Sequence, residues 1–138
     1  MGDLNRFIDA QNGNGPGPRF ESALAELRNC KKEGHWIWYV FPQIAGLGTS
    51  ANSSKYALAD LDEARDYLQN ATLGPRLRES IEAVLSCEGT AKSIFAHDDV
   101  KFHACVTLFS IAETEDELFQ RALSRFFSGP HQATLDRL

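Results

Sequence analysis

Residues 35–50 hold the densest group of side chains that could contact a ligand. They read His-Trp-Ile-Trp-Tyr-Val-Phe-Pro-Gln over 35–43 and Gly-Leu-Gly-Thr-Ser over 46–50. Imidazole titrates near neutral pH, so His35 could act as an acid, a base or an anion contact. Indole and phenol rings can stack on a base or sugar, and glycine-rich turns bring backbone N–H groups close to an anion. The ligand-binding residues predicted here are Trp36, Trp38, Tyr39, Phe41, Gln43, Gly46, Gly48 and Ser50.

The same segment can also be explained without a ligand. Residues 36–41 are aromatic at four of six positions, and their polar atoms are confined to ring tips. A helix with so little polar surface must be buried almost all round or line a cavity. The aromatic rings could therefore be ordinary core, with His35 as a capping residue, and both interpretations stay open.

Residues 97–107 form the second candidate group. Asp98 is predicted to cap the helix that follows. Asp99 and His103 are four residues apart and share a face, so they could form an acid–imidazole pair or a solvated surface pair. Lys101 begins the most apolar helix of the chain and could point its charge inward as an anion contact. Lys101 and Thr107, on the same helix, are further predicted ligand-binding residues.

Several chemistries lack their motifs. The chain has no His-x-x-x-His or His-Glu-x-x-His spacing for a metal, and no Gly-x-Ser-x-Gly nucleophile turn. The Gly-Thr-Ser run at 48–50 lacks the lysine of a phosphate-binding loop. Cys30, Cys87 and Cys105 are widely spaced and are interpreted as small buried hydrophobic residues. We therefore expect no metal and no cofactor.

Composition limits the classes of partner. The chain has 138 residues and a formal net charge of −5. Its basic residues cluster only at Arg28, Lys31 and Lys32, which could hold one phosphate-bearing small molecule but are too few for a nucleic-acid duplex. No apolar run is long enough to cross a membrane and no signal peptide is visible, so a cytoplasmic location is predicted.

The pattern of apolar residues predicts an all-α protein in which about eight helices, several of them short, form a single domain over 1–138. A Gly/Pro-rich loop at 12–18 is expected to be flexible. Ser53 or Ser54, Asp60, Thr90 and Thr114 are predicted helix caps. The predicted helices span 3–11, 19–33, 35–41, 54–69 with a break near Asp60, 73–87, 98–112, 116–127 and 131–138, with a short turn at 91–95.

The chain resembles the bacterial family called domain of unknown function 1810. The resemblance is carried by the 35–43 and 46–50 motifs, Leu-Asp-Glu-Ala-Arg at 61–65, Leu-Gly-Pro-Arg-Leu at 73–77 and Thr-Leu-Phe at 107–109. It implies a compact helical fold with irregular, armadillo-like packing, and it supplies no established activity. The chain departs from the family pattern at Ala71-Thr72, Ala96, His103–Val106 and Gln132.

The order of these motifs is also similar to that of all-helical domains that process ADP-ribose or related phosphoribosides. On this basis we expect a small anionic, nucleotide-derived or ADP-ribose-like ligand, with His35 and Lys101 at its phosphate. If the protein is an enzyme, glycosidic hydrolysis with His35 or Asp99 as the catalytic acid–base group is the hypothesis. The alternative is an armadillo-like module that binds a protein partner without catalysis and exposes an apolar groove.

Overall fold

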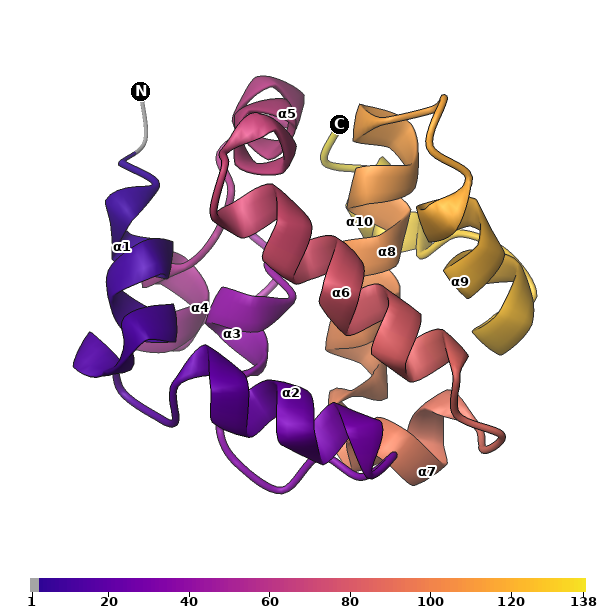
Figure 1. Cartoon of the computed structure of the whole chain (residues 1–138). Coiled ribbons are helices and arrows are strands. Elements are labelled where there is room, and N and C mark those ends of the chain that lie inside the picture. The colour runs from indigo at the N-terminus through magenta and orange to yellow at the C-terminus, as the bar shows by residue number, and fades with distance from the viewer. Residues whose placement is uncertain (1–2) are drawn as a thin grey trace.

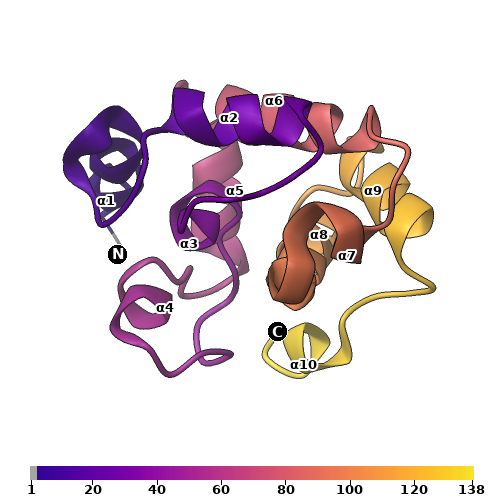
Figure 2. The same ribbon diagram turned by 90° about the horizontal axis from the view of Figure 1, so that it is seen from below.

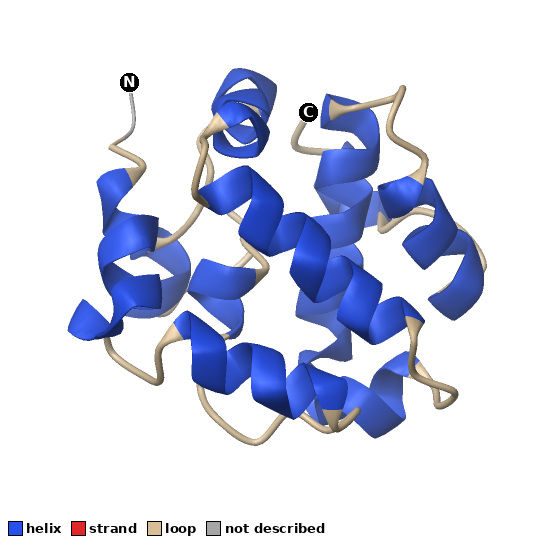
Figure 3. Ribbon diagram, in the orientation of Figure 1, coloured by secondary structure: helices blue, strands red, loops and turns tan. Residues whose placement is uncertain are grey.

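The computed structural model describes residues 3–138, and within them the chain forms helices and no β-strand (Figure 3). The all-α prediction is confirmed. A π-helical turn covers Ala10–Asn14 and a 3-10 turn covers Ala96–Asp98. The α-helices are α1 (Asn5–Asp9), α2 (Phe20–Arg28), α3 (Ile37–Val40), α4 (Ala51–Lys55), α5 (Leu61–Gln69), α6 (Leu73–Leu85), α7 (Ala91–Phe95), α8 (Asp99–Ala112), α9 (Leu118–Phe126) and α10 (Gln132–Leu135).

Helix α8 lies at the centre of the packing, where it contacts α3, α5, α7, α9 and α10 (Figure 1). Its sequence explains this position, because apolar residues cover most of its circumference. Figure 2 shows α2 and α6 side by side along one side of the molecule, with α4 and α10 at the other. None of the helices in residues 3–138 is both long and apolar enough to span a bilayer.

Packed aromatic rings join the 36–41 segment to α7 and α8. The Phe95 and Phe102 rings stack with centroids 4.4 Å apart, and Phe41 meets Phe102 edge-on at 5.1 Å. Trp36 packs on Phe41 at 6.1 Å. Pairs of this kind add to the stability that burial alone provides. The backbone of α3 is therefore fixed against the core, and this fixes the direction of Trp38 on its other side.

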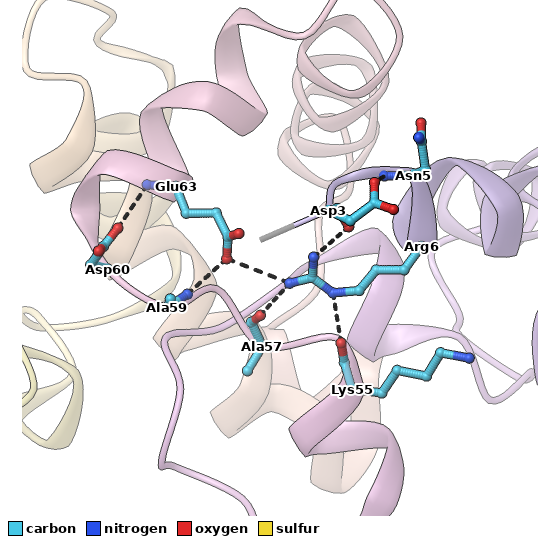
Figure 4. A network of polar contacts seen from close by, with 8 residues as sticks. All are labelled: Asp3, Asn5, Arg6, Lys55, Ala57, Ala59, Asp60 and Glu63. Carbon is cyan, nitrogen blue, oxygen red and sulfur yellow. Dashed lines mark hydrogen bonds and ion pairs between the residues drawn. The ribbon is translucent and has the colours of Figure 1, made fainter. Parts of the chain in front are cut away.

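Arg6 connects α1 to the segment between α4 and α5 (Figure 4). Its guanidinium donates to the carbonyls of Lys55 at 2.7 Å and Ala57 at 2.6 Å, and lies 3.5 Å from Glu63 Oε1. The same carboxylate oxygen accepts from Ala59 N at 2.8 Å. These contacts hold the C-terminal end of α4 in place, and α4 forms part of the candidate site.

Three predicted helix caps differ from the structure. Helix α4 begins earlier than expected, since Ser50, rather than Ser53 or Ser54, accepts from Ser53 N at 3.0 Å. Helix α9 begins at Leu118, whose N–H bonds to Asp116, so the predicted Thr114 cap is wrong. Asp98 precedes α8 but makes no capping bond, because its carboxylate pairs with two lysines. The Asp60 and Thr90 caps are confirmed.

The glycine-rich segment is partly helical. Residues 10–14 form the π-helical turn, with Gly13 at a φ of 101° that favours glycine. Gln11, directly before the predicted loop, is buried and donates to Tyr39 O at 2.7 Å, whereas residues 12–16 are exposed. The flexibility of 12–18, the single domain and the armadillo-like packing stay predictions.

The prediction for the cysteines is wrong for two of the three. Cys30 and Cys87 form a disulfide across a sequence separation of 57 residues, with Cα atoms 5.7 Å apart. The pair forms because α2 and α6 lie side by side and end close together, which the wide spacing in the sequence conceals. Cys105 is buried and unpaired, as predicted.

Candidate functional site

A cleft of about 590 Å³ lies between the 38–53 segment on one side and α8 and α10 on the other. Its walls come from three separate stretches of the chain. The lining residues are Trp38, Gln43, Leu47, Gly48, Thr49, Ser50, Ser53, Val100, Lys101, His131 and Ala133. The chemical content is one indole, one amide, three hydroxyls, one lysine and one histidine.

Trp38 lines the cleft because α3 is a single turn. Its neighbours Ile37, Tyr39 and Val40 point into the core, which leaves Trp38 half-buried on the remaining side. Its indole Nε1 is shielded from solvent and has no hydrogen-bond partner within residues 3–138. A buried donor left unpaired costs about 1–3 kcal/mol, so this atom would gain from an acceptor.

The side of the cleft that carries the hydroxyls of Ser50 and Ser53 is held by contacts within its own segment. The Ser50 hydroxyl donates to Ser53 Oγ at 2.9 Å while it caps α4. Gly48 approaches Ser53 so closely that a Cβ at position 48 would lie 2.5 Å from the Ser53 hydroxyl oxygen. A glycine is therefore required for this wall to close as it does.

Lys101 brings an excess positive charge to the cleft. Its Nζ lies 3.3 Å from Asp98 Oδ1, and Lys32 Nζ lies closer, 2.8 Å from Oδ2 of the same carboxylate. Burial acts to raise the pKa of Asp98, but the hydrogen bond and charge of Lys32, with Lys101 behind them, hold that pKa below its ordinary value. The carboxylate is thus ionised and shared by two cations, of which Lys101 is the one that lines the cleft.

His131 is a cleft residue that no sequence motif singles out. Its backbone N–H donates to Thr107 Oγ1 at 2.9 Å, and its Nδ1 lies 2.9 Å from Thr134 Oγ1. Burial, followed by the nearby His103, lowers the pKa of the imidazole. The sequence shows only a histidine three residues before Thr134 and directly after Gly-Pro; its place in the cleft depends on the packing of α10 against α8.

Several predicted ligand-binding residues lie in the core instead of the cleft. Trp36, Tyr39 and Phe41 are fully buried. Trp36 Nε1 donates to Glu26 Oε1 at 2.8 Å, and the Tyr39 hydroxyl donates to the Pro18 carbonyl. Their polar atoms are therefore satisfied within the protein, which agrees with the alternative that most of this segment is core.

The remaining candidates are also placed apart from the cleft. His35 is exposed, and Asp99 lies 3.9 Å from Lys92. His103 forms no acid–imidazole pair with Asp99; it bonds the Gly129 carbonyl at 2.7 Å and stacks on Phe127. The predicted cluster of Arg28, Lys31 and Lys32 is divided, because Arg28 pairs with Glu79 and Lys32 with Asp98.

Two predicted residues support the cleft from behind. Thr107 is fully buried and accepts from the His131 backbone, so it positions α10. Gly46 has a φ of 94°, and its carbonyl accepts from Arg137 at 2.9 Å, a bond between the two walls. The structure thus brings Trp38, Gln43, Gly48, Ser50 and Lys101 together around one cleft.

Another depression of about 590 Å³ lies over α9. It is lined by Leu85, Glu117, Gln120, Arg121, Ser124 and Arg125. Acidic and basic side chains mix there without an aromatic ring, which makes it a weaker candidate for a ligand. No group of three or more His, Cys, Asp or Glu residues within 3–138 could hold a metal ion.

Comparison with known proteins places the chain in a family. A search of curated proteins finds no match. Among solved structures, the conserved hypothetical protein Rv1873 from Mycobacterium tuberculosis matches with 37% sequence identity and a TM-score of 0.92, over 99% of this chain and 96% of its own. The family model described as "Protein of unknown function (DUF1810)" matches residues 1–138. With the whole chain covered and the same helical fold in its relative, the protein belongs to the DUF1810 family.

Proposed function

We propose that the cleft binds a small anionic metabolite of the nucleotide or ADP-ribose class. The observation that carries this proposal is the charge of the cleft: Lys101 lines it, and none of the lining residues, all drawn from the described part of the chain, is a carboxylate. A protein with a net charge of −5 thus has a locally positive cleft. An anion there would meet attraction in a partly shielded environment, where charges interact more strongly than in water.

The charge of Lys101 is available because Asp98 is already compensated. Lys32 has a side chain only 6% exposed and binds Asp98 at the shorter distance. The trio of two lysines and one aspartate therefore carries a net positive charge. The Lys101 side chain, at 32% exposed, is the member that an entering ligand can reach.

The uncharged lining fits the rest of a nucleotide-like ligand. The Trp38 ring, with Leu47 and Val100, provides an apolar surface on which a base or sugar can stack. Gln43 and the hydroxyls of Thr49, Ser50 and Ser53 supply donors and acceptors for a ribose or an amide edge. A few polar groups set in an apolar wall are typical of small-ligand sites.

The proposal is for binding. The hypothesis of glycosidic hydrolysis needed a carboxylate at the reacting carbon, and Asp99 and His35 lie outside the lining of the cleft. The interaction-module alternative needs an exposed apolar groove. Among the described residues the exposed large hydrophobic side chains are Val100 and Leu138, too few to form one.

The test is a ligand panel of ADP-ribose, AMP, ribose phosphate and inorganic phosphate. Tryptophan fluorescence and thermal melting measure the binding of each ligand. We expect ADP-ribose or AMP to quench Trp38 saturably and to raise the melting temperature, because a ligand that binds only the folded state stabilises it. Trp36 provides a second emission from the core, and Trp38→Phe should abolish the quench.

Lys101→Ala is the decisive variant, with Lys92→Ala as its matched control. Lys92 lies on the neighbouring helix α7, is 75% exposed and does not line the cleft. We expect Lys101→Ala to weaken binding about tenfold or more, and Lys92→Ala to leave it unchanged. Equal affinities in the two variants, or a panel without any response, would overturn the proposal.

A further inference from the structure

Two titratable side chains line the cleft among the residues that the structure describes, Lys101 and His131. An imidazole can change its charge near neutral pH. The charge of His131 therefore depends on the pH and on the charges beside it, Lys101 among them. This dependence links the binding of a charged ligand to the binding of a proton.

Two threonine hydroxyls hold His131 in place. The backbone N–H of His131 donates to the hydroxyl of Thr107, and the ring Nδ1 lies 2.9 Å from the hydroxyl of Thr134. Both threonines are fully buried, so neither contact depends on a mobile surface group. A hydroxyl can donate or accept, so Thr134 can bond the ring in its neutral and its charged form. Nε2 makes no hydrogen bond within residues 3–138, which leaves it for a ligand.

The groups that face His131 disfavour a charge on it in the empty cleft. The His103 ring on α8 lies 5.2 Å away, centroid to centroid, and its Nε2 is 2.7 Å from the Gly129 carbonyl, which can only accept a hydrogen bond. Lys101, on the same helix, lines the same cleft. The lining residues include no carboxylate in the described chain to offset a second cation. Burial and His103 accordingly lower the pKa of His131.

We propose that His131 is the proton-linked anion contact of the cleft: its ring is neutral when the cleft is empty and takes up a proton when an anionic ligand binds beside Lys101. This inference rests on the proposed function, because it needs an anion in the cleft. By linkage, a ligand that favours the charged ring must bind more tightly when the ring is charged. Affinity should therefore rise as the pH falls.

The experiment measures ADP-ribose affinity by tryptophan quenching between about pH 5.5 and about pH 8. ADP-ribose is the probe because its two phosphates are joined in a diphosphate bridge and carry no group that titrates in this interval. We expect the dissociation constant to rise with pH by up to about tenfold per unit across the interval between the free and bound pKa values. Calorimetry in two buffers of different ionisation enthalpy should show uptake of a proton.

His131→Gln is the variant, since glutamine can still hydrogen-bond but cannot become charged. We expect it to bind ADP-ribose with an affinity that no longer depends on pH. His35→Gln is the matched control, because His35 is exposed and outside the cleft, and it should keep the wild-type pH profile. Thermal melting shows whether each variant is folded, and the proton uptake of the wild-type protein tests the inference without any variant.

The outcomes separate this inference from the proposed function. Binding of ADP-ribose that depends on Lys101 but is equally tight at all pH values overturns the role of His131 and leaves the proposed function standing. A pH profile that persists in His131→Gln has the same meaning. Absence of ADP-ribose binding at every pH overturns this inference, and the proposed function is overturned with it when the other ligands of the panel give no response either.

Discussion

Asp98 is the residue on which the charge balance of the site depends. Its carboxylate pairs with a lysine that is almost fully buried and with a second lysine at the cleft. From the sequence, Asp98 is predicted to cap a helix, because an acidic residue at a helix start ordinarily has that role. The pairing with Lys32 links positions 66 residues apart in the chain, so only the folded structure could reveal it.

The stability of the protein should depend on pH through this residue. The folded pKa of Asp98 lies below its ordinary value of 3.8, so the ionised form favours folding above that value, and this contribution is lost as the pH falls through the lower folded pKa. We expect Asp98→Asn to lower the free energy of unfolding at neutral pH by about 3 kcal/mol, because Lys32 would be left buried without its counter-ion. The loss should shrink in acid.

Urea denaturation at neutral pH and near pH 3 would measure this effect. Asp62→Asn is the matched control, because the Asp62 side chain is 90% exposed and its pair with Arg65 lies at the surface. An equal loss of stability in the two variants would contradict the buried pair.

At the level of elements, one side chain of α1 bonds the segment that leaves α4. Arg6 reaches from α1 to carbonyls at 55 and 57, where the chain leaves α4 and has no helix bonds of its own (Figure 4). Its side chain is 19% exposed and that of Glu63 only 8%. The side of the cleft that carries Ser50 and Ser53 is thus stabilised by a contact that no local sequence pattern predicts.

We expect Arg6→Ala to destabilise the protein by about 2 kcal/mol, because the carbonyls and the Glu63 carboxylate would lose a charged donor in a shielded position. Arg6→Lys should recover little of the loss, because a single ammonium cannot reach the separate acceptors as a planar fork does. The measurement is the urea midpoint. Arg19→Ala, which removes an exposed pair with Glu21, should change the urea midpoint little. A similar shift of the midpoint in Arg6→Ala and Arg19→Ala would contradict the role given to Arg6.

On the scale of the whole molecule, the Cys30–Cys87 disulfide joins the ends of α2 and α6. The closed loop spans 57 residues and contains α3, α4, α5 and α6, and therefore one wall of the cleft. A cross-link of this length restricts the unfolded chain, which on the chain-entropy account stabilises the folded state by roughly 4 kcal/mol.

We expect a thiol reductant to lower the urea midpoint of the wild-type protein, and to leave that of the Cys30→Ser/Cys87→Ser variant unchanged. The oxidised protein should be more stable than the double variant by about 2–4 kcal/mol. Cys105→Ser is the control for thiol chemistry alone, because Cys105 is buried and outside the bond. A midpoint in the wild-type protein that is indifferent to reductant would show that the bond does not support the fold.

By itself the sequence determined the helical class, most helix positions and the segment that forms one wall of the cleft, because apolar spacing and capping residues act within a few positions of each other. It also selected Lys101, whose charge stands out in an apolar helix. It could not separate Trp38 from Trp36, since a single helical turn decides which ring meets the core.

The tertiary structure alone decided the partners that are distant in the chain. The disulfide, the sharing of Asp98 by Lys32 and Lys101, and the arrival of His131 beside the 38–53 segment all depend on how the helices pack. Packing joins residues by shape and burial over long sequence separations, and short-range patterns carry no record of those pairings. For the same reason Asp99 and His103, neighbours on one helix, are directed to different partners by the elements around them.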